Sequence, residues 1–130
     1  MYKLEILHHP YNPTDLEEIF AINQANIPEV GNIDHIDRLK RLIDWSCHLI
    51  VVRDKEIAGF IILMRENQSY ESLNYEFFNS QGYPFLYVDR IAIKEEHRRK
   101  GLGHMIYSKT IEIAKAVSYT HLTLPTTPYV

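Results

Sequence analysis

Residues 85–103 read FLYVDRIAIKEEHRRKGLG, and this stretch decides the fold. Its first nine residues, Phe85–Ile93, form a β-branched and aromatic run, which predicts a strand. Apolar residues recur at helical spacing over Leu102–Ala116, which predicts a helix that lies on a sheet. A charged turn joins the two and ends in the pattern Arg98-x-x-Gly101-x-Gly103. A strand that leads through such a turn into a helix indicates an α/β domain.

The chain before this stretch supplies the other elements. Alternation predicts a strand over residues 2–7, and the capping-box pattern Thr14-x-x-Glu17 predicts a helix over 14–25. A second helical pattern follows, with Asp34 as its expected N-cap. Residues 48–64 have the pattern of a hairpin, in which Gly59 indicates a bulge or close packing. Residues 67–84 are expected to be a loop, although a strongly aromatic one. The order β-α-α-β-β-β-α predicts a mixed α/β domain with a partly antiparallel sheet.

The composition sets limits on function. The chain has 130 residues and a net charge of -3, with 45% hydrophobic and 24% charged residues, which suits one globular domain. This acidic balance argues against general nucleic-acid binding. Cys47 is the only cysteine, so no internal disulfide can form, and no signal peptide is read. The longest apolar run, residues 60–64, is too short to cross a bilayer. We therefore expect a cytoplasmic protein with no nucleic-acid or membrane partner, and the scattered histidines predict no metal site.

The turn that ends at Gly103 has backbone and side-chain groups that favour an anion. The first N–H groups of a helix have no partner within the helix, and the helix dipole adds partial positive charge there. Gly101 and Gly103 let the backbone come close to a ligand, and glycine tolerates a positive φ. The side chains of Arg98, Arg99 and Lys100 add attraction for phosphate. These features together predict a pyrophosphate site.

Two common phosphate-binding patterns are not met. The pattern G-x-x-x-x-G-K-[ST] fails because no lysine follows either glycine in that register, and G-x-G-x-x-G fails at Ile106. The spacing Arg-x-x-Gly-x-Gly after a strand instead resembles the acetyl-CoA signature of the GNAT N-acetyltransferase superfamily. The strand residues 88–93, the helix residues 107–116 and the upstream order of elements resemble the same family. The resemblance covers residues 1–116.

The resemblance implies acetyl-CoA as the acyl donor and a GNAT-like fold. Backbone amides from Arg99 to His104 would hold the pyrophosphate of CoA. Main-chain groups of Ile91 and Ile93 would pair with the pantetheine arm, and an amide near Ile91 would polarise the thioester carbonyl. The implied set of CoA-binding residues is Ile91, Ala92, Ile93, Arg98, Arg99, Lys100, Gly101, Leu102, Gly103 and His104.

The resemblance also implies a proton acceptor on the quoted strand, since the amine attacks the acetyl group directly. With two residues per repeat, one face of the strand is expected to carry Tyr87, Asp89, Ile91 and Ile93, and the other Val88, Arg90 and Ala92. Tyr87 and Asp89 are the catalytic candidates, with Asp89 as the base. The alternative for Asp89 is a structural salt bridge. The general acid is expected beyond Ala116.

The aromatic segment before the strand has two interpretations. It can form a wall of the acceptor pocket, with Tyr75 and Phe78 as the substrate-contacting residues, or it can cover the edge of the sheet. The sequence favours neither.

The character of the chain changes at Val117. Residues 117–127 carry no charge and no helical period, and they resemble a translated transposase end running into a sequencing adapter. We therefore expect an incomplete domain over 1–116, truncated after the CoA-binding helix, and a non-native tail over 117–130. The alternative is a native Thr/Pro-rich extension. In the first case one edge of the quoted strand is expected to be unpaired.

The resulting prediction is an acyltransferase that moves an acetyl group from acetyl-CoA to a primary amine. The alternatives are a CoA-binding or regulatory module without catalysis, and an inactive truncated fragment. The acceptor and the oligomeric state are left open by the sequence.

Overall fold

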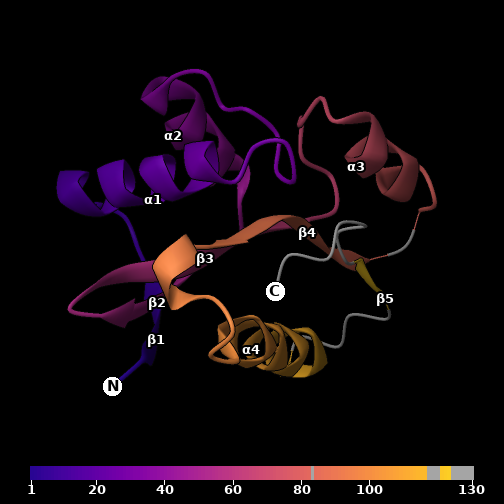
Figure 1. Ribbon diagram of the computed structural model, residues 1–130. Coiled ribbons are helices and arrows are strands. Elements are labelled where there is room, and N and C mark those ends of the chain that lie inside the picture. The colour runs from indigo at the N-terminus through magenta and orange to yellow at the C-terminus, as the bar shows by residue number, and fades with distance from the viewer. Residues whose placement is uncertain (83, 117–120, 124–130) are drawn as a thin grey trace.

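A single mixed sheet forms the centre of the fold (Figure 1). The computed structural model describes residues 1–82, 84–116 and 121–123. Within them five strands lie in the order β1-β2-β3-β4-β5. The strands are β1 (Lys3–Leu7), β2 (His48–Asp54), β3 (Glu56–Arg65), β4 (Phe85–Ile93) and β5 (His121–Thr123). The first four pair antiparallel in sequence order, and β5 pairs parallel to β4. The predicted α/β class with a partly antiparallel sheet is confirmed.

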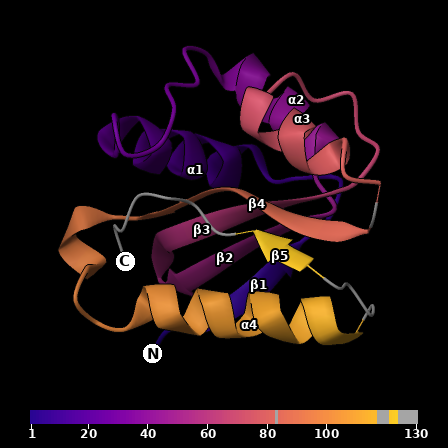
Figure 2. The same cartoon turned by 90° about the vertical axis from the view of Figure 1, so that its right-hand side faces the viewer.

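Helices cover both faces of this sheet (Figures 1 and 2). The described residues form α1 (Pro13–Ala25), α2 (Ile36–Trp45), α3 (Leu73–Asn79), α4 (Leu102–Ala116) and the short 3-10 helix η1 (Glu95–His97). Helices α1, α2 and α3 lie on one face, and α4 lies on the other. Each face has its own apolar core. Because β2 and β3 are covered on both faces, they are almost continuously apolar. None of these helices is long and apolar enough to cross a membrane.

The starts of α1 and α2 differ from the predicted caps. The Asn12 side chain accepts a hydrogen bond from the Thr14 N–H at 2.8 Å, and the helix begins at Pro13. Proline suits this first position because its missing N–H would have no partner there. His35 caps α2, since its ring Nδ1 accepts a backbone hydrogen bond at 3.1 Å, while Asp34 has a φ of 65°. The predictions of Thr14 and Asp34 as caps are therefore wrong.

Helix α3 lies in the segment that was expected to be a loop. The Ser72 hydroxyl accepts a hydrogen bond from the Tyr75 N–H at 3.3 Å and so caps the helix. At seven residues, α3 is too short to show a clear helical period, and its aromatic and asparagine residues have only moderate helix propensity. Tyr75 is fully buried and Phe78 packs against the core, whereas Phe77 is largely exposed.

Gly59 shows both features that the sequence indicated. The pairing register of β2 and β3 slips between Val52 and Arg53, next to Gly59. A Cβ on Gly59 would lie 2.6 Å from Cδ1 of Ile93 and 3.0 Å from the carbonyl oxygen of Ala92. The absence of a side chain at Gly59 therefore lets β3 and β4 pack closely where β4 approaches η1.

A second bulge changes the faces of β4. Ile62 pairs with Arg90 and Leu63 pairs with Val88, so Asp89 is the extra residue. Tyr87 and Ala92 therefore belong to the core under α1–α3, and Val88, Ile91 and Ile93 belong to the core under α4. The predicted alternation is wrong beyond Asp89, because a bulge reverses the sense of every residue after it.

The segment predicted as a non-native tail, 117–130, lies mostly outside the described residues. The same is true of the general acid expected beyond Ala116. The described part, His121–Thr123, pairs with Phe85–Tyr87. The expectation that one edge of the fourth strand is unpaired is therefore wrong for Phe85–Tyr87.

Candidate functional site

The turn in which the sequence predicts an anion site lies in the connection from β4 to α4. This connection runs through η1 and then through a turn in which Arg99 and Gly101 have φ values of 63° and 76°. The Gly101 carbonyl accepts a hydrogen bond from the Met105 N–H at 3.1 Å. Gly101 thus adopts the left-handed conformation that glycine tolerates best, at the point where α4 begins.

The backbone amides of this turn are available to a ligand. Across the described ranges, none of the N–H groups from Arg99 to His104 donates a hydrogen bond to the protein. A Cβ built on Gly101 would have no other atom within 4 Å, so the space in front of the turn is open. Successive unpaired N–H groups at a helix start attract an anion. The structure therefore places the predicted amides together in an open turn.

Arg98 differs from its basic neighbours because its side chain holds the turn in place. Its guanidinium donates to the side-chain oxygen of Asn26 and, at 3.4 Å, to the carbonyl of Ile93. Asn26 is buried at the end of α1, and its amide group donates to the carbonyl of Ile22 at 2.7 Å. Its amide also reaches the Ile93 carbonyl at 3.4 Å. Arg98 and the Ile93 carbonyl thus connect the turn to α1.

Two predicted cations remain on the surface of the turn. Arg99 and Lys100 are exposed, and neither forms an ion pair with another described residue.

The other side of η1 is fixed to the β2–β3 hairpin. His97 lies 2.7 Å from the Tyr2 hydroxyl through Nδ1 and 2.9 Å from the Glu56 carboxylate through Nε2. The hydrogen bonds of Glu56 to His97 and to Lys94 lower the pKa of the Glu56 carboxyl group.

Asp89 and Arg90 form a buried ion pair at the bulge. Nε of Arg90 lies 2.8 Å from Oδ2 of Asp89, and the two side chains are 9% and 3% exposed. Arg90 also donates at 3.0 Å both to Oδ1 of Asn23 and to the carbonyl of Gly31. The Tyr70 hydroxyl is a hydrogen-bond partner of both charged groups, and burial and the nearby Asp89 charge raise its pKa. Asp89 therefore takes part in a buried salt bridge, as the alternative interpretation expected.

Tyr87 lies on the same face of β4 as this ion pair. Its hydroxyl accepts a hydrogen bond from the Asn74 amide at 3.2 Å and has Ser72 as a second partner. Burial raises the pKa of Tyr87, so its hydroxyl is protonated at neutral pH. The hydroxyl can therefore donate a hydrogen bond, but it is a poor proton acceptor.

The two predicted substrate residues pack against the core. The Tyr75 hydroxyl donates to the carbonyl of Arg65 and accepts from the Gln68 N–H at 2.9 Å. Tyr75 also contacts the rings of Phe85 and Tyr87 at centroid distances of 5.7 and 5.3 Å. These contacts favour the interpretation in which the aromatic segment covers the sheet.

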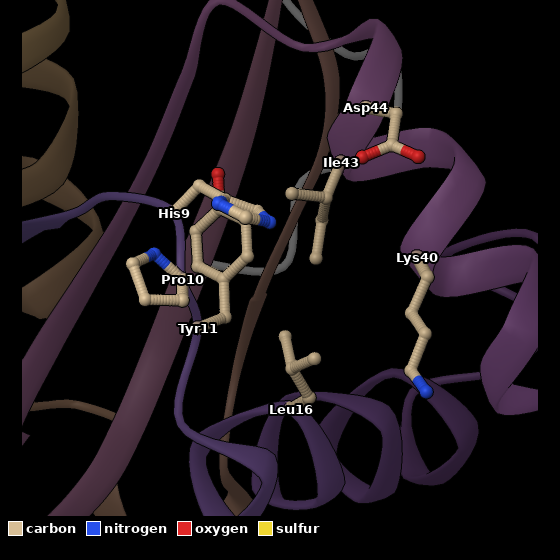
Figure 3. Close-up of a pocket in the computed structure, with 7 residues that line it drawn as sticks. All are labelled: His9, Pro10, Tyr11, Leu16, Lys40, Ile43 and Asp44. Carbon is tan, nitrogen blue, oxygen red and sulfur yellow. The ribbon is translucent and has the colours of Figure 1, made fainter.

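Two cavities on the face of α1–α3 were not found from the sequence. One, of about 220 Å³, is lined by Arg38, Trp45, Tyr70, Glu71 and Ser72. The other, of about 300 Å³, lies between the β1–α1 connection and α2 (Figure 3) and contains none of the predicted site residues. The aromatic pair Trp45 and Tyr70 was the available signal for the first cavity, but a tryptophan at a helix end is more often a packing residue.

The family of this chain is shown by a match to a protein-family model. The model of the "Acetyltransferase (GNAT) family" matches residues 15–129. The chain belongs to this family. No curated protein matches the sequence. GNAT membership agrees with the resemblance drawn from the β4–α4 turn, and the matched range includes that turn.

Solved structures share the GNAT fold at low sequence identity. A ribosomal-protein-alanine N-acetyltransferase from Brucella melitensis biovar Abortus 2308 has a TM-score of 0.68 at 18% identity, over 98% of this chain and 82% of that one. Glucosamine-6-phosphate N-acetyltransferase from Arabidopsis thaliana has a TM-score of 0.63 at 15% identity, over 95% and 81%. The NatC complex bound to Gag peptide and CoA contains a chain with a TM-score of 0.68 at 11% identity, over 91% and 69%.

Proposed function

We propose that this chain is an N-acetyltransferase that takes an acetyl group from acetyl-CoA and transfers it to a primary amine. The observation that carries the proposal is the row of open N–H groups from Arg99 to His104, at the start of α4 in a GNAT fold. Such a row suits the pyrophosphate of CoA. The exposed side chains of Arg99 and Lys100 add positive charge beside it.

The donor would lie along the end of β4 and across the turn. Leu102, Gly103 and His104 supply the first N–H groups of α4, and Gly101 leaves the approach open. Ile91, Ala92 and Ile93 lead from the bulge to this turn, so the pantetheine arm would follow them. The Ile93 carbonyl already accepts hydrogen bonds from Asn26 and Arg98, so we assign no pantetheine contact to it.

The reaction itself requires orientation and a proton acceptor. The amine nitrogen attacks the acetyl carbon, a C–N bond forms, the C–S bond breaks, and CoA leaves as a thiolate that takes up a proton. We propose Asp89 as the acceptor of the amine proton, because its carboxylate lies at the bulge of β4. The protonated hydroxyl of Tyr87, on the same face, would serve as a hydrogen-bond donor.

A CoA-binding module without catalysis is the second candidate. The observation in its favour is the ion pair of Asp89 with Arg90, which already uses the carboxylate of the proposed base. In this case the turn would bind CoA, and no amine would be acetylated.

Two measurements on the full chain test these functions. Calorimetric titration with CoA measures binding at the turn, and release of free thiol from acetyl-CoA in the presence of a panel of amines measures transfer. Binding together with amine-dependent thiol release supports the acetyltransferase. Binding without release by any amine favours the module. Absence of CoA binding contradicts both.

A further inference from the structure

The cavity of about 220 Å³ between α2 and the start of α3 is connected to the proposed catalytic residues. Its lining includes Tyr70 and Ser72. The Tyr70 hydroxyl is hydrogen-bonded to Asp89, and the Ser72 side chain is a partner of the Tyr87 hydroxyl. Two residues of the cavity wall therefore touch the two catalytic candidates of β4. The cavity therefore adjoins the part of β4 that carries Tyr87 and Asp89.

The wall of the cavity combines an apolar surface with a hydroxyl group. The rings of Trp45 and Tyr70 lie 5.4 Å apart between centroids, with a tilt of 41° between their planes. Tyr70 is buried and Trp45 is half-buried, so part of the indole faces the cavity. This surface suits the methylene groups of a small ligand.

Two oppositely charged side chains line the same cavity and do not form an ion pair with each other. Arg38 on α2 and Glu71 before α3 both line it, and both are exposed. Neither side chain forms an ion pair or hydrogen bond with any residue that the structure describes. The guanidinium is therefore free to hold a carboxylate, and the carboxylate of Glu71 is free to attract an ammonium group.

We propose that this cavity binds the acetyl acceptor and that the acceptor is a small aminocarboxylic acid. Its carboxylate pairs with Arg38, its methylene groups contact Trp45 and Tyr70, and its amine points inward toward Asp89. The volume is below the range of about 300–1,000 Å³ that encloses drug-sized ligands, which favours a single amino acid over an enclosed peptide. The inference rests on the proposed function. In the reaction the amino nitrogen bonds to the acetyl carbon, the thioester C–S bond breaks, CoA leaves with the electron pair as a thiolate that takes up a proton, and the amine proton passes to Asp89.

Trp45 gives a direct readout of binding, because it is the only tryptophan in the chain and lines the cavity. The full chain is titrated with α-amino acids and with ω-amino acids of increasing length, and in parallel with amines of the same length that lack the carboxylate. We expect at least one amino acid to change the Trp45 fluorescence with an affinity at least 10-fold tighter than that of its matched amine. The same preference is expected in kcat/KM for thiol release from acetyl-CoA.

Arg38→Gln is the test variant, and Arg41→Gln is its control. Arg41 is also exposed on α2, but it does not line this cavity. We expect Arg38→Gln to weaken amino acid binding at least 10-fold, to leave the affinity for the matched amine within twofold and to leave CoA binding unchanged. Arg41→Gln should bind like the unmodified chain.

The inference is overturned if amines bind as tightly as amino acids, or if Arg38→Gln and Arg41→Gln behave alike. Both results are compatible with acetyl transfer to another acceptor. Failure of the proposed function is a separate result, because it is seen as absent CoA binding or absent thiol release and not in the Trp45 signal.

Discussion

Arg90 binds the carboxylate of Asp89, its own neighbour along β4, at 2.8 Å. Adjacent residues of a regular strand point to opposite faces, so this contact depends on the bulge at Asp89. Arg90 also donates hydrogen bonds to Asn23 in α1 and to the Gly31 carbonyl, so it joins β4 to α1 and to the α1–α2 connection.

The first prediction concerns Asp89. We expect Asp89→Asn to lower kcat at least about 100-fold while the affinity for CoA stays within twofold, because the amide cannot accept the amine proton. The substitution also leaves the buried Arg90 without its counter-charge, so we expect a loss of about 3 kcal/mol in the free energy of unfolding. Steady-state kinetics, CoA titration and urea unfolding measure the three quantities.

Arg90→Met separates the two roles of Asp89. It removes the ion pair but keeps the carboxylate, so it should share the instability of Asp89→Asn and retain more turnover. If both variants lose stability and keep wild-type kcat, Asp89 is structural only.

The second prediction concerns Gly101. We expect Gly101→Val to weaken CoA binding at least 10-fold, because a β-branched residue resists the φ of 76° and its side chain occupies the open approach to the turn. Gly82→Val is the matched control, since Gly82 has a φ of 78° and equally open surroundings. Both variants should lose similar stability, about 1–2 kcal/mol. Equal CoA affinity in the two variants would contradict the assignment of the turn.

The third prediction separates the two interpretations of the aromatic segment. Tyr75→Phe removes the hydroxyl that bonds to the Arg65 carbonyl and the Gln68 N–H, so we expect a loss of about 1–3 kcal/mol in the free energy of unfolding. KM for the amine should not change. Tyr107→Phe is the control, because the Tyr107 hydroxyl has no hydrogen bond to the described part of the chain. A change in KM without a change in stability would favour the acceptor-wall interpretation.

The fourth prediction concerns acid stability. The pKa of Glu56 is lowered in the folded chain by its hydrogen bonds to His97 and Lys94. Its contribution to stability is therefore present above the unfolded pKa of about 4.5 and is lost as the pH falls through the lower folded pKa. We expect Glu56→Gln to reduce stability at pH 7 and to flatten its decline below pH 4.5, as measured by urea unfolding at several pH values. Glu29→Gln, at an exposed residue without an ion pair to described residues, should change neither.

The sequence predicted the elements that depend on local pattern. β4 and α4 have the predicted bounds, and the open amides from Arg99 to His104 lie where the motif placed them. The sequence could not predict which side chains of β4 point to which face of the sheet beyond Asp89. The bulge at Asp89 arises from pairing with β3, and no local sequence pattern indicates it.

The missed parts of the site depend on contacts between distant segments. The sequence predicted Arg98 as a CoA-binding residue but not its contact with Asn26, which lies far away in the chain and is buried beside it only in the folded structure. The cavity at Trp45 likewise joins α2 to the start of α3, and α3 was not predicted. Residue spacing along the chain reveals a backbone motif more readily than a pocket that two distant segments form together.

The connection between β4 and β5 has a consequence for folding kinetics. β2 and β3 meet through a tight hairpin, whereas β4 and β5 meet only after α4 has crossed the sheet. Contacts that close a long stretch of chain carry a larger entropic cost, so we expect the hairpin to form before the crossover is complete. A ligand held by the turn before α4 would then stabilise a late-forming part of the molecule, and it would act mainly by slowing unfolding.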